Sequence, residues 1–319
     1  MERLLERSVL SHYCLLDNTM SSYKTKKEMS IGSAYIAAII TIIFWGFSFI
    51  WSNNIIKADI PIFTFLFVRL AIAGATLLIF SKLTGKLQKV GIKDLLLMCL
   101  MAFFEPFIYF IGESYGMKET GSGVLAAIII ATIPIACMIA ERLLSNVKFT
   151  IQRVLGILIT IPGIVMVIFK DEVISVKHWY GIALLFMAVL GGTGYAVVVK
   201  KLSDKYNSYT VASYQFTLGA LMFLPFFIAY GVDGINAKLF TLEILGPILA
   251  LAILCSCVAF TFWVSAIRVL GITRANVFTA LIPAVSAVAA MMIGDEQITV
   301  VSGIGIFIVI CGVILAQRK

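Results

Sequence analysis

The stretch ALIPAVSAVAAMMIGDEQITVVSGIGIFIVICG, residues 280–312, consists of two apolar runs separated by a polar turn, Gly294–Glu296. A proline lies in the first run, and two glycines follow it by 22 and 29 residues in the second run. The first half of the chain repeats this spacing at an offset of 149 residues. The matching residues are Ala131, Pro134, Gly156 and Gly163 in the first half, and Ala280, Pro283, Gly305 and Gly312 in the second. This match inside two apolar hairpins predicts a duplicated unit.

The composition excludes an ordinary soluble domain. Hydrophobic residues make up 61% of the 319 residues and charged residues 13%, against about 25% charged residues in an average soluble domain. The mean hydropathy of +1.03 points the same way. A soluble core cannot absorb this much apolar surface, so we predict an integral membrane protein embedded in a lipid bilayer. The net charge of +8 is then a matter of loop charges, and we expect no nucleic-acid partner.

Ten apolar stretches are long enough for a helix to cross a hydrocarbon layer of about 30 Å. They are residues 32–51, 61–80, 94–115, 121–141, 151–169, 179–199, 208–230, 244–267, 273–293 and 300–317. Ten spans divide into five and five, with a join at Lys170–His178, in agreement with the duplication. We therefore predict an all-α fold with a five-helix repeat at residues 31–170 and a second at 171–319. Residues 1–30 form a polar leader without the layout of a signal peptide, and we expect it to be disordered.

Basic residues concentrate in alternate loops. With the N-terminus in the cytoplasm, the inner segments carry 19 of the 25 Lys and Arg residues and the outer loops carry 5, while Arg69 lies inside a span. Cytoplasmic loops are enriched in Lys and Arg, so both termini are predicted to be cytoplasmic. Because each repeat has an odd number of spans, the two repeats insert with opposite orientations. Inverted-topology repeats of this kind place a transport site near the bilayer midplane, between the two halves.

The third predicted span carries a polar face. Glu105, Tyr109 and Glu113 recur at i, i+4 and i+8, which places them on one side of a helix. Pro106 loosens the helix at this point because it removes a backbone donor. We expect this face to line a water-filled cavity. Glu113 lies close to the outer boundary of the span, where an interfacial charge is the alternative interpretation.

Arg69 lies in the second predicted span, at a depth similar to that of Glu105. Charged residues inside spans are costly and by default indicate a functional site. The two side chains are within reach of each other if their helices are neighbours. Two interpretations remain open. Either the two residues form an ion pair that fixes the packing, or Glu105 is free to meet a substrate amine or to carry a proton.

Other polar or aromatic side chains interrupt the apolar spans. For each residue alone, packing, helix contact or interface anchoring is favoured over ligand binding, but together these residues are candidates for a substrate-binding cavity. They are Trp45 and Ser48 in the first span, Thr132 in the fourth, Tyr195 in the sixth, Trp263 in the eighth and Asn276 at the start of the ninth.

Catalytic and metal-binding patterns are absent from the sequence. The chain has no HExxH motif, no GxSxG motif and no cluster with metal-ligand spacing, and both histidines lie outside the predicted spans. The six cysteines lie mostly in apolar runs, where Cys behaves as a small hydrophobic residue. We therefore expect no enzyme, no metal site and no cofactor.

From residue 31 to residue 317, the chain resembles the ten-helix EamA type of the drug/metabolite transporter superfamily. In the first half, the resemblance rests on Phe44–Phe49 (FWGFSF) and on Val68–Leu70 (VRL). In the second half, it rests on Leu270–Ala275 (LGITRA), Pro283, Gly294–Thr299 (GDEQIT), Gly305 and Gly312. The family has Gly-Glu at its hairpin, whereas Asp295 stands between Gly294 and Glu296 here. The first repeat departs further, because Val147 occupies the equivalent hairpin position.

The resemblance implies a carrier of the inner membrane with a central cavity between its halves. We accordingly expect a secondary transporter that exports small organic metabolites, such as amino acids, by alternating access. Protons are the candidate coupling ion, with Glu105 as the candidate coupling carboxylate. The alternatives are a proton-independent facilitator, or a membrane sensor that binds a metabolite without moving it. Both a monomer and a homodimer are consistent with the sequence.

Overall fold

The computed structural model describes residues 29–145, 150–168, 176–293 and 299–316, and nearly all of them are helical. The first repeat contains α2 (Ile31–Lys57), α3 (Ile62–Leu83), α4 (Ile92–Ala102), η1 (Phe103–Ile108), α5 (Tyr109–Thr120), α6 (Gly123–Ile130), α7 (Ile133–Ser145) and α8 (Ile151–Ile168). The second contains α9 (Val176–Lys205), α10 (Ser208–Tyr230), the 3-10 turns η2 (Val232–Gly234) and η3 (Ala237–Phe240), α11 (Leu242–Ala250), η4 (Leu251–Val258), α12 (Ala259–Leu270), α13 (Ile272–Thr279), α14 (Ile282–Ile293) and α15 (Val300–Ala316). The predicted leader lies, up to residue 28, outside the described residues.

The described residues contain seven helical segments that are long and apolar enough to cross a membrane, together with three shorter apolar helices. The three shorter ones are Val154–Met166, Ile282–Ile293 and Val300–Ala316. The helical elements fall on the ten predicted spans. The all-α membrane fold with two five-helix repeats is therefore confirmed.

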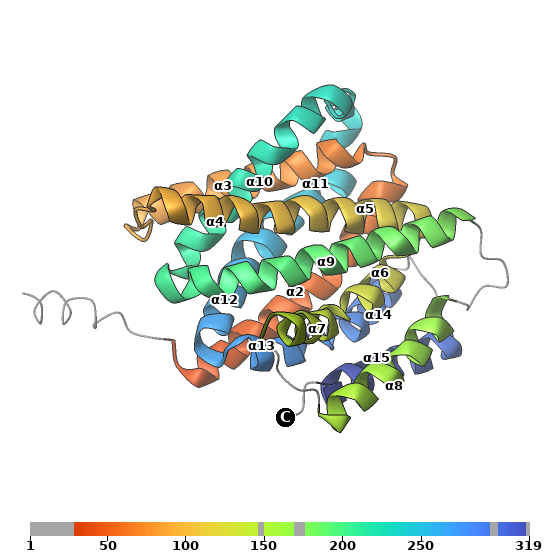
Figure 1. Ribbon diagram of the computed structural model, residues 1–319. Coiled ribbons are helices and arrows are strands. Elements are labelled where there is room, and N and C mark those ends of the chain that lie inside the picture. Colours follow the sequence, from red (N-terminus) through yellow and green to blue (C-terminus); the bar gives the residue numbers. More distant parts are fainter. Residues whose placement is uncertain (1–28, 146–149, 169–175, 294–298, 317–319) are drawn as a thin grey trace, which may run out of the picture.

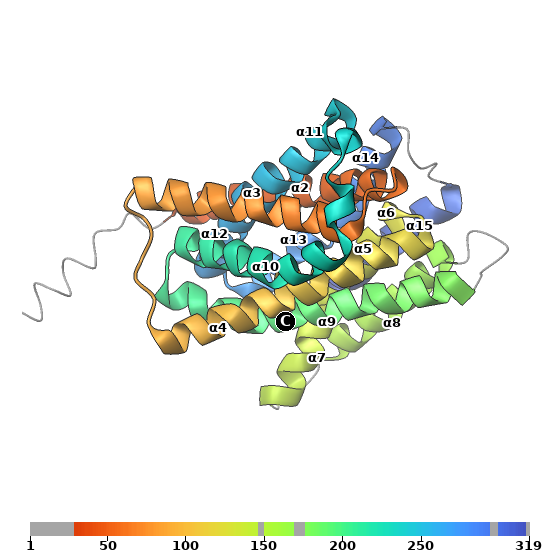
Figure 2. The ribbon, with the colours of Figure 1, turned by 90° about the horizontal axis from the view of Figure 1, so that it is seen from above.

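The two repeats exchange helix contacts in matched pairs. Equivalent helices pack on each other in two places, α3 on α10 and α8 on α15 (Figures 1 and 2). Elsewhere the contacts are exchanged: α5 packs on α9 as α12 packs on α2, and η4 packs on α3 as η1 packs on α10. This exchange is what two repeats related by a pseudo-twofold axis produce, as in inverted-repeat transporters.

The third and fourth spans of each repeat are interrupted, although the sequence predicts continuous helices. The third spans change to the π-helical segments η1 and η4. The fourth spans break just before Pro134 in α7 and just before Pro283 in α14. A proline has no N–H to donate and has a fixed φ, so it is best tolerated in the first turn of a helix. The duplicated prolines therefore correspond to duplicated helix breaks.

The duplicated glycines lie where α8 crosses α15, at one edge of the bundle (Figure 1). A Cβ on Gly156 would lie 2.3 Å from the backbone nitrogen of Ala316, and a Cβ on Gly312 would lie 2.4 Å from Thr160 Oγ1. A Cβ on Gly163 would lie 2.9 Å from the carbonyl oxygen of Gly305. Small residues allow membrane helices to approach this closely. Residues 280–293 and 299–312 are therefore packing elements, and the predicted polar turn, Gly294–Glu296, lies outside the described residues.

We expect Gly156→Ala to lower the free energy of unfolding by about 1–3 kcal/mol, because the added methyl group overpacks the crossing. The clash is with backbone atoms of α15, which cannot rotate away as a flexible side chain does. Denaturation in detergent micelles, followed by circular dichroism, measures the change. Gly303→Ala is the matched control, because a Cβ at Gly303 meets no atom within 4 Å. Equal stability of the two variants would contradict the assignment.

The two repeats are also joined by polar contacts at the lysine-rich end of the bundle. Asp94, in the first turn of α4, accepts hydrogen bonds from the Lys205 ammonium and, at 2.6 Å, from the Tyr206 hydroxyl. Beside them, the side-chain oxygen of Gln88 accepts a hydrogen bond from the backbone N–H of Asn207 at 2.6 Å. These contacts fix the loop between α3 and α4 against the turn between α9 and α10.

Candidate functional site

A cavity with a volume of about 70 Å³ lies between the two repeats. This is room for several waters. The first repeat lines it with Trp45, Ser48, Phe49, Arg69, Glu105, Tyr109, Phe110, Glu113, Ile130 and Ile133. The second repeat lines it with Gly192, Tyr195, Ala196, Phe260, Trp263, Ile267, Asn276, Thr279 and Ile282. Both halves therefore build one site.

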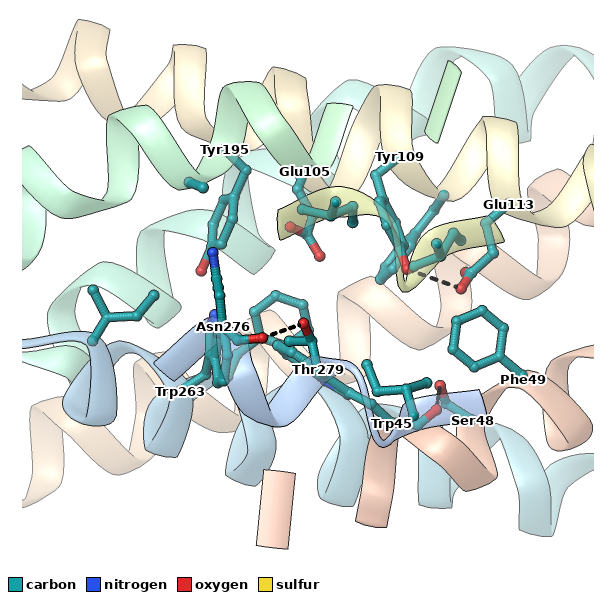
Figure 3. Close-up of a pocket in the computed structure, with 18 of the residues that line it drawn as sticks. Trp45, Ser48, Phe49, Glu105, Tyr109, Glu113, Tyr195, Trp263, Asn276 and Thr279 are labelled. Atoms are coloured by element: carbon teal, nitrogen blue, oxygen red, sulfur yellow. Dashed lines mark hydrogen bonds between the residues drawn. The ribbon is translucent and has the colours of Figure 1, made fainter. Parts of the chain in front are cut away.

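Eight of the nine candidate substrate-binding or ion-pair residues lie on the wall of this cavity (Figure 3 draws most of them). They are Trp45, Ser48, Arg69, Glu105, Tyr109, Tyr195, Trp263 and Asn276. The structure thus brings together side chains from six predicted spans. Contact of these side chains with a substrate stays a prediction.

The ninth residue, Thr132, is not part of the wall. It lies at the break between α6 and α7, and its hydroxyl donates a hydrogen bond to the carbonyl oxygen of Ile129 at 2.6 Å. The break turns its neighbours Ile130 and Ile133 toward the cavity instead. The sequence predicts a continuous helix here, and that prediction could not show that Ile130 and Ile133 line the cavity in place of Thr132.

Glu105 owes its position to the interruption of the third span. Its backbone is non-helical, with φ −146° and ψ 115°, and Pro106 follows it inside η1. The side chain is buried, and Figure 3 shows its carboxyl group pointing into the cavity between Tyr195 and Tyr109. Within the described part of the chain, this carboxyl group takes part in no hydrogen bond or ion pair. It is therefore available to a ligand or a proton.

Glu113 lies on the wall of the cavity, and the interpretation of this residue as an interfacial charge is wrong. It is only 4% exposed, although it lies near the end of its span. Its carboxylate accepts a hydrogen bond from the Tyr109 hydroxyl at 3.3 Å (dashed in Figure 3). The i, i+4, i+8 spacing is the sequence signal that connects this residue with Glu105.

Arg69 is held by the second repeat and does not form the ion pair with Glu105 that the sequence left open. Its Nε donates a hydrogen bond to the hydroxyl of Ser256, in η4, at 3.1 Å. Its guanidinium carbon lies 4.2 Å from the ring centroid of Phe110, a cation–π contact. Glu113 is the carboxylate that attracts it most strongly. The cavity wall therefore contains one buried cation, held by the second repeat through Ser256, and two buried carboxyl groups on the third span.

Aromatic rings form the wall at the opposite side of the cavity. The ring centroid of Trp45 lies 5.1 Å from that of Trp263 and 5.0 Å from that of Phe260. The indole N–H of Trp45 donates a hydrogen bond to the carbonyl oxygen of Cys255 at 3.3 Å, which fixes its orientation. Sequence reasoning missed Phe260. Its spacing of three residues from Trp263 is the signal that places the two on one helix face.

Tyr195 and Asn276 close the end of the cavity next to Trp263 (Figure 3). Tyr195 is 3% exposed, and its hydroxyl group has no hydrogen-bond partner of normal geometry among the described residues. Glycines at 191 and 194 let α9 approach η1 closely, because a Cβ there would lie within 3 Å of atoms of Phe104. A buried, unpaired donor at the wall is a group that a bound ligand can satisfy.

Comparisons with known proteins agree with this architecture. A model described as "EamA-like transporter family" matches residues 32–169 and again residues 179–317. An uncharacterized transporter of Archaeoglobus fulgidus is 28% identical over 285 residues, which cover 89% of this chain and 99% of the relative. The uncharacterized transporter YetK of Bacillus subtilis is 24% identical over 298 residues, which cover 92% of this chain and 88% of the relative.

A solved crystal structure, 16% identical in sequence, covers 90% of this chain and 97% of its own with a TM-score of 0.66. At this identity the likeness shows the fold alone. The limits of the two domains stay a prediction. The two family matches together cover most of the chain. The two relatives, which match this chain over most of their own lengths, are both named as transporters. This multi-pass membrane protein is a member of the EamA-like transporter family.

Proposed function

We propose that the protein is a secondary transporter that exports small organic metabolites by alternating access around the cavity between its repeats. The observation that carries this proposal is that residues of both repeats build one buried polar site. A rocking motion of one repeat against the other would open such a site to each side in turn. The proposed location is the inner membrane with both termini in the cytoplasm, because the basic residues of the inner loops favour that orientation.

The chemistry of the wall favours amino acids or related compounds as substrates. The Arg69 guanidinium suits a carboxylate, and the free carboxyl group of Glu105 suits an ammonium group. The rings of Trp45 and Trp263 offer apolar faces to the remainder of the substrate. The same Glu105 carboxyl group is the candidate carrier of a coupling proton.

We expect purified protein in proteoliposomes to catalyse counterflow of at least one labelled amino acid in a panel that covers acidic, basic, small and aromatic side chains. Counterflow requires both binding and movement of the substrate, so it separates a carrier from a sensor. Trp263→Ala should reduce the apparent affinity at least about tenfold, since truncating a buried aromatic contact costs roughly 1.4 kcal/mol or more. Gly303→Ala should leave counterflow unchanged.

Saturable binding of a panel member without counterflow would favour the sensor. Counterflow in a protein whose substrate uptake does not respond to an imposed pH gradient would favour the facilitator. Absence of both binding and counterflow across the panel would count against amino acids as the substrate class.

A further inference from the structure

Gln215 lies in α10, behind the wall of the cavity, and has no exposed surface. Its side-chain nitrogen donates a hydrogen bond to the main-chain carbonyl oxygen of Glu105 at 3.3 Å. The donor belongs to the second repeat and the acceptor to the first. A buried amide side chain is costly unless it is hydrogen-bonded, so this contact has an energetic reason to persist.

The Glu105 carbonyl oxygen needs an outside donor because of the helix interruption. In a regular helix it would accept a hydrogen bond from the backbone N–H of Tyr109, four residues later. Here the Tyr109 N–H donates to the oxygens of Phe104 and Pro106 instead. Gln215 therefore supplies the bond that the helix itself has lost at Glu105.

The same face of α10 is shaped to receive the interruption. Gly219 lies one helical turn after Gln215, and a Cβ at Gly219 would lie 2.3 Å from Cγ of Pro106. A larger residue at this position would push Pro106 and the Glu105 carbonyl away from α10. The glycine and the glutamine together seat the irregular segment on the second repeat.

The side chain of Gln215 also neighbours the cavity residue Tyr195. The Gln215 side-chain oxygen and the Tyr195 hydroxyl are both buried, and neither has a hydrogen-bond partner of normal geometry among the described residues. Gln215 therefore stands between two wall residues without belonging to the wall.

The other repeat has a matching device. Arg69 reaches from α3 to Ser256 in η4, as Gln215 reaches from α10 to Glu105 in η1. In both cases, the second span of one repeat makes a hydrogen bond to the π-helical segment in the third span of the other. The repetition indicates that these bonds belong to the architecture of the site rather than to incidental packing.

We propose that Gln215 is a positioning residue: through the Glu105 main chain it holds the irregular segment η1 so that the Glu105 carboxyl group stays in the cavity. Its effect on transport rests on the proposed function, whereas its effect on the segment does not. Loss of the amide leaves the Glu105 carbonyl without a donor in a buried place, which favours local opening of η1.

Hydrogen–deuterium exchange tests the structural part without any substrate. Gln215→Met keeps the length of the side chain and removes the amide, and we expect exchange in the peptide covering residues 103–109 to become about tenfold faster. Ser213→Ala is the matched control, because it removes another buried bond between α10 and α3, Ser213 to Ser81 at 3.0 Å, away from the cavity. Exchange within twofold of the unaltered protein in Gln215→Met would overturn the proposal. If this variant does not fold, Gln215→Asn retains a buried amide that is too short to reach Glu105 and takes the same test.

The functional part uses the amino acid that counterflow identifies. Gln215→Met should raise the half-saturating concentration about tenfold in the unaltered background and less than twofold in the Glu105→Gln background, since Gln215 acts through Glu105. Equal effects in both backgrounds would overturn a role through Glu105 and leave Gln215 as a packing residue. If no amino acid is transported, the proposed function fails, and the exchange experiment still decides the positioning of η1.

Discussion

Replacement of Glu105 by Gln is expected to abolish flux driven by a pH gradient in proteoliposomes, with a loss of about a hundredfold or more, while the protein still folds. The carboxyl group points into the cavity and is free of hydrogen bonds and ion pairs among the described residues. Under the proposed mechanism, we therefore expect it to take up and release a proton as the cavity opens to one side and then the other. The amide of Gln has the same shape but cannot carry the proton.

The measurement compares uptake driven by an imposed pH gradient with counterflow at equal pH on both sides. Loss of the first with retention of the second assigns coupling to Glu105. Glu119→Gln is the matched control, because it makes the same replacement on the same span, at its partly exposed end outside the cavity. Unchanged gradient-driven flux in Glu105→Gln would remove Glu105 from this role and favour the facilitator.

Glu113 is a weaker candidate for coupling for a structural reason. Its carboxylate already accepts a hydrogen bond from Tyr109, and its strongest attraction is to the Arg69 guanidinium. These two interactions occupy the Glu113 carboxylate, whereas the Glu105 carboxyl group has no such partner among the described residues. The two carboxyl groups on one helix face thus have different surroundings, which the spacing alone does not reveal.

The sequence was most informative where a polar residue interrupts an apolar span. Glu105, Arg69 and Asn276 were found this way because a charged or amide side chain inside the bilayer is energetically costly and therefore indicates a functional site. Ile130 and Ile133 lie on the wall of the same cavity but could not be distinguished from other apolar residues in apolar spans. Their side chains face the cavity because of where the helices cross, and a single sequence does not determine that.

The duplicated prolines and glycines predicted the fold but not the position of the candidate site. Gly156 and Gly312 allow α8 and α15 to approach each other at the edge of the bundle. Pro134 and Pro283 stand just after the breaks in the fourth spans. The irregular backbone at Glu105 was foreshadowed only by Pro106, because a proline shows that a helix is weakened but not which neighbour then supplies the missing bond.

Arg69→Met is expected to destabilise the protein by about 3 kcal/mol or more, because it leaves the buried Glu113 carboxylate, which attracts Arg69 most strongly, without a cation. Arg69 is 2% exposed, and the two carboxyl groups of the cavity are similarly buried. Thermal unfolding in detergent and the yield of folded protein measure the loss. Methionine retains most of the length of the apolar stem, so the charge and its hydrogen bond to Ser256 account for most of the difference.

The double variant Arg69→Met/Glu113→Gln should recover most of this loss, because it removes the carboxylate that Arg69 attracts most strongly. Arg69→Met/Glu119→Gln is the matched control and should recover none, since Glu119 lies outside the cavity. If Glu105→Gln instead of Glu113→Gln restored stability in the Arg69→Met background, Arg69 would be shown to compensate Glu105. That is the pairing that the similar depths of the two residues in their spans favour. Such a result would tie the proposed coupling carboxylate to a fixed cation. Recovery by Glu113→Gln alone would show that Arg69 does not compensate Glu105. Glu105 would then be the cavity carboxyl group that is available to substrate and proton.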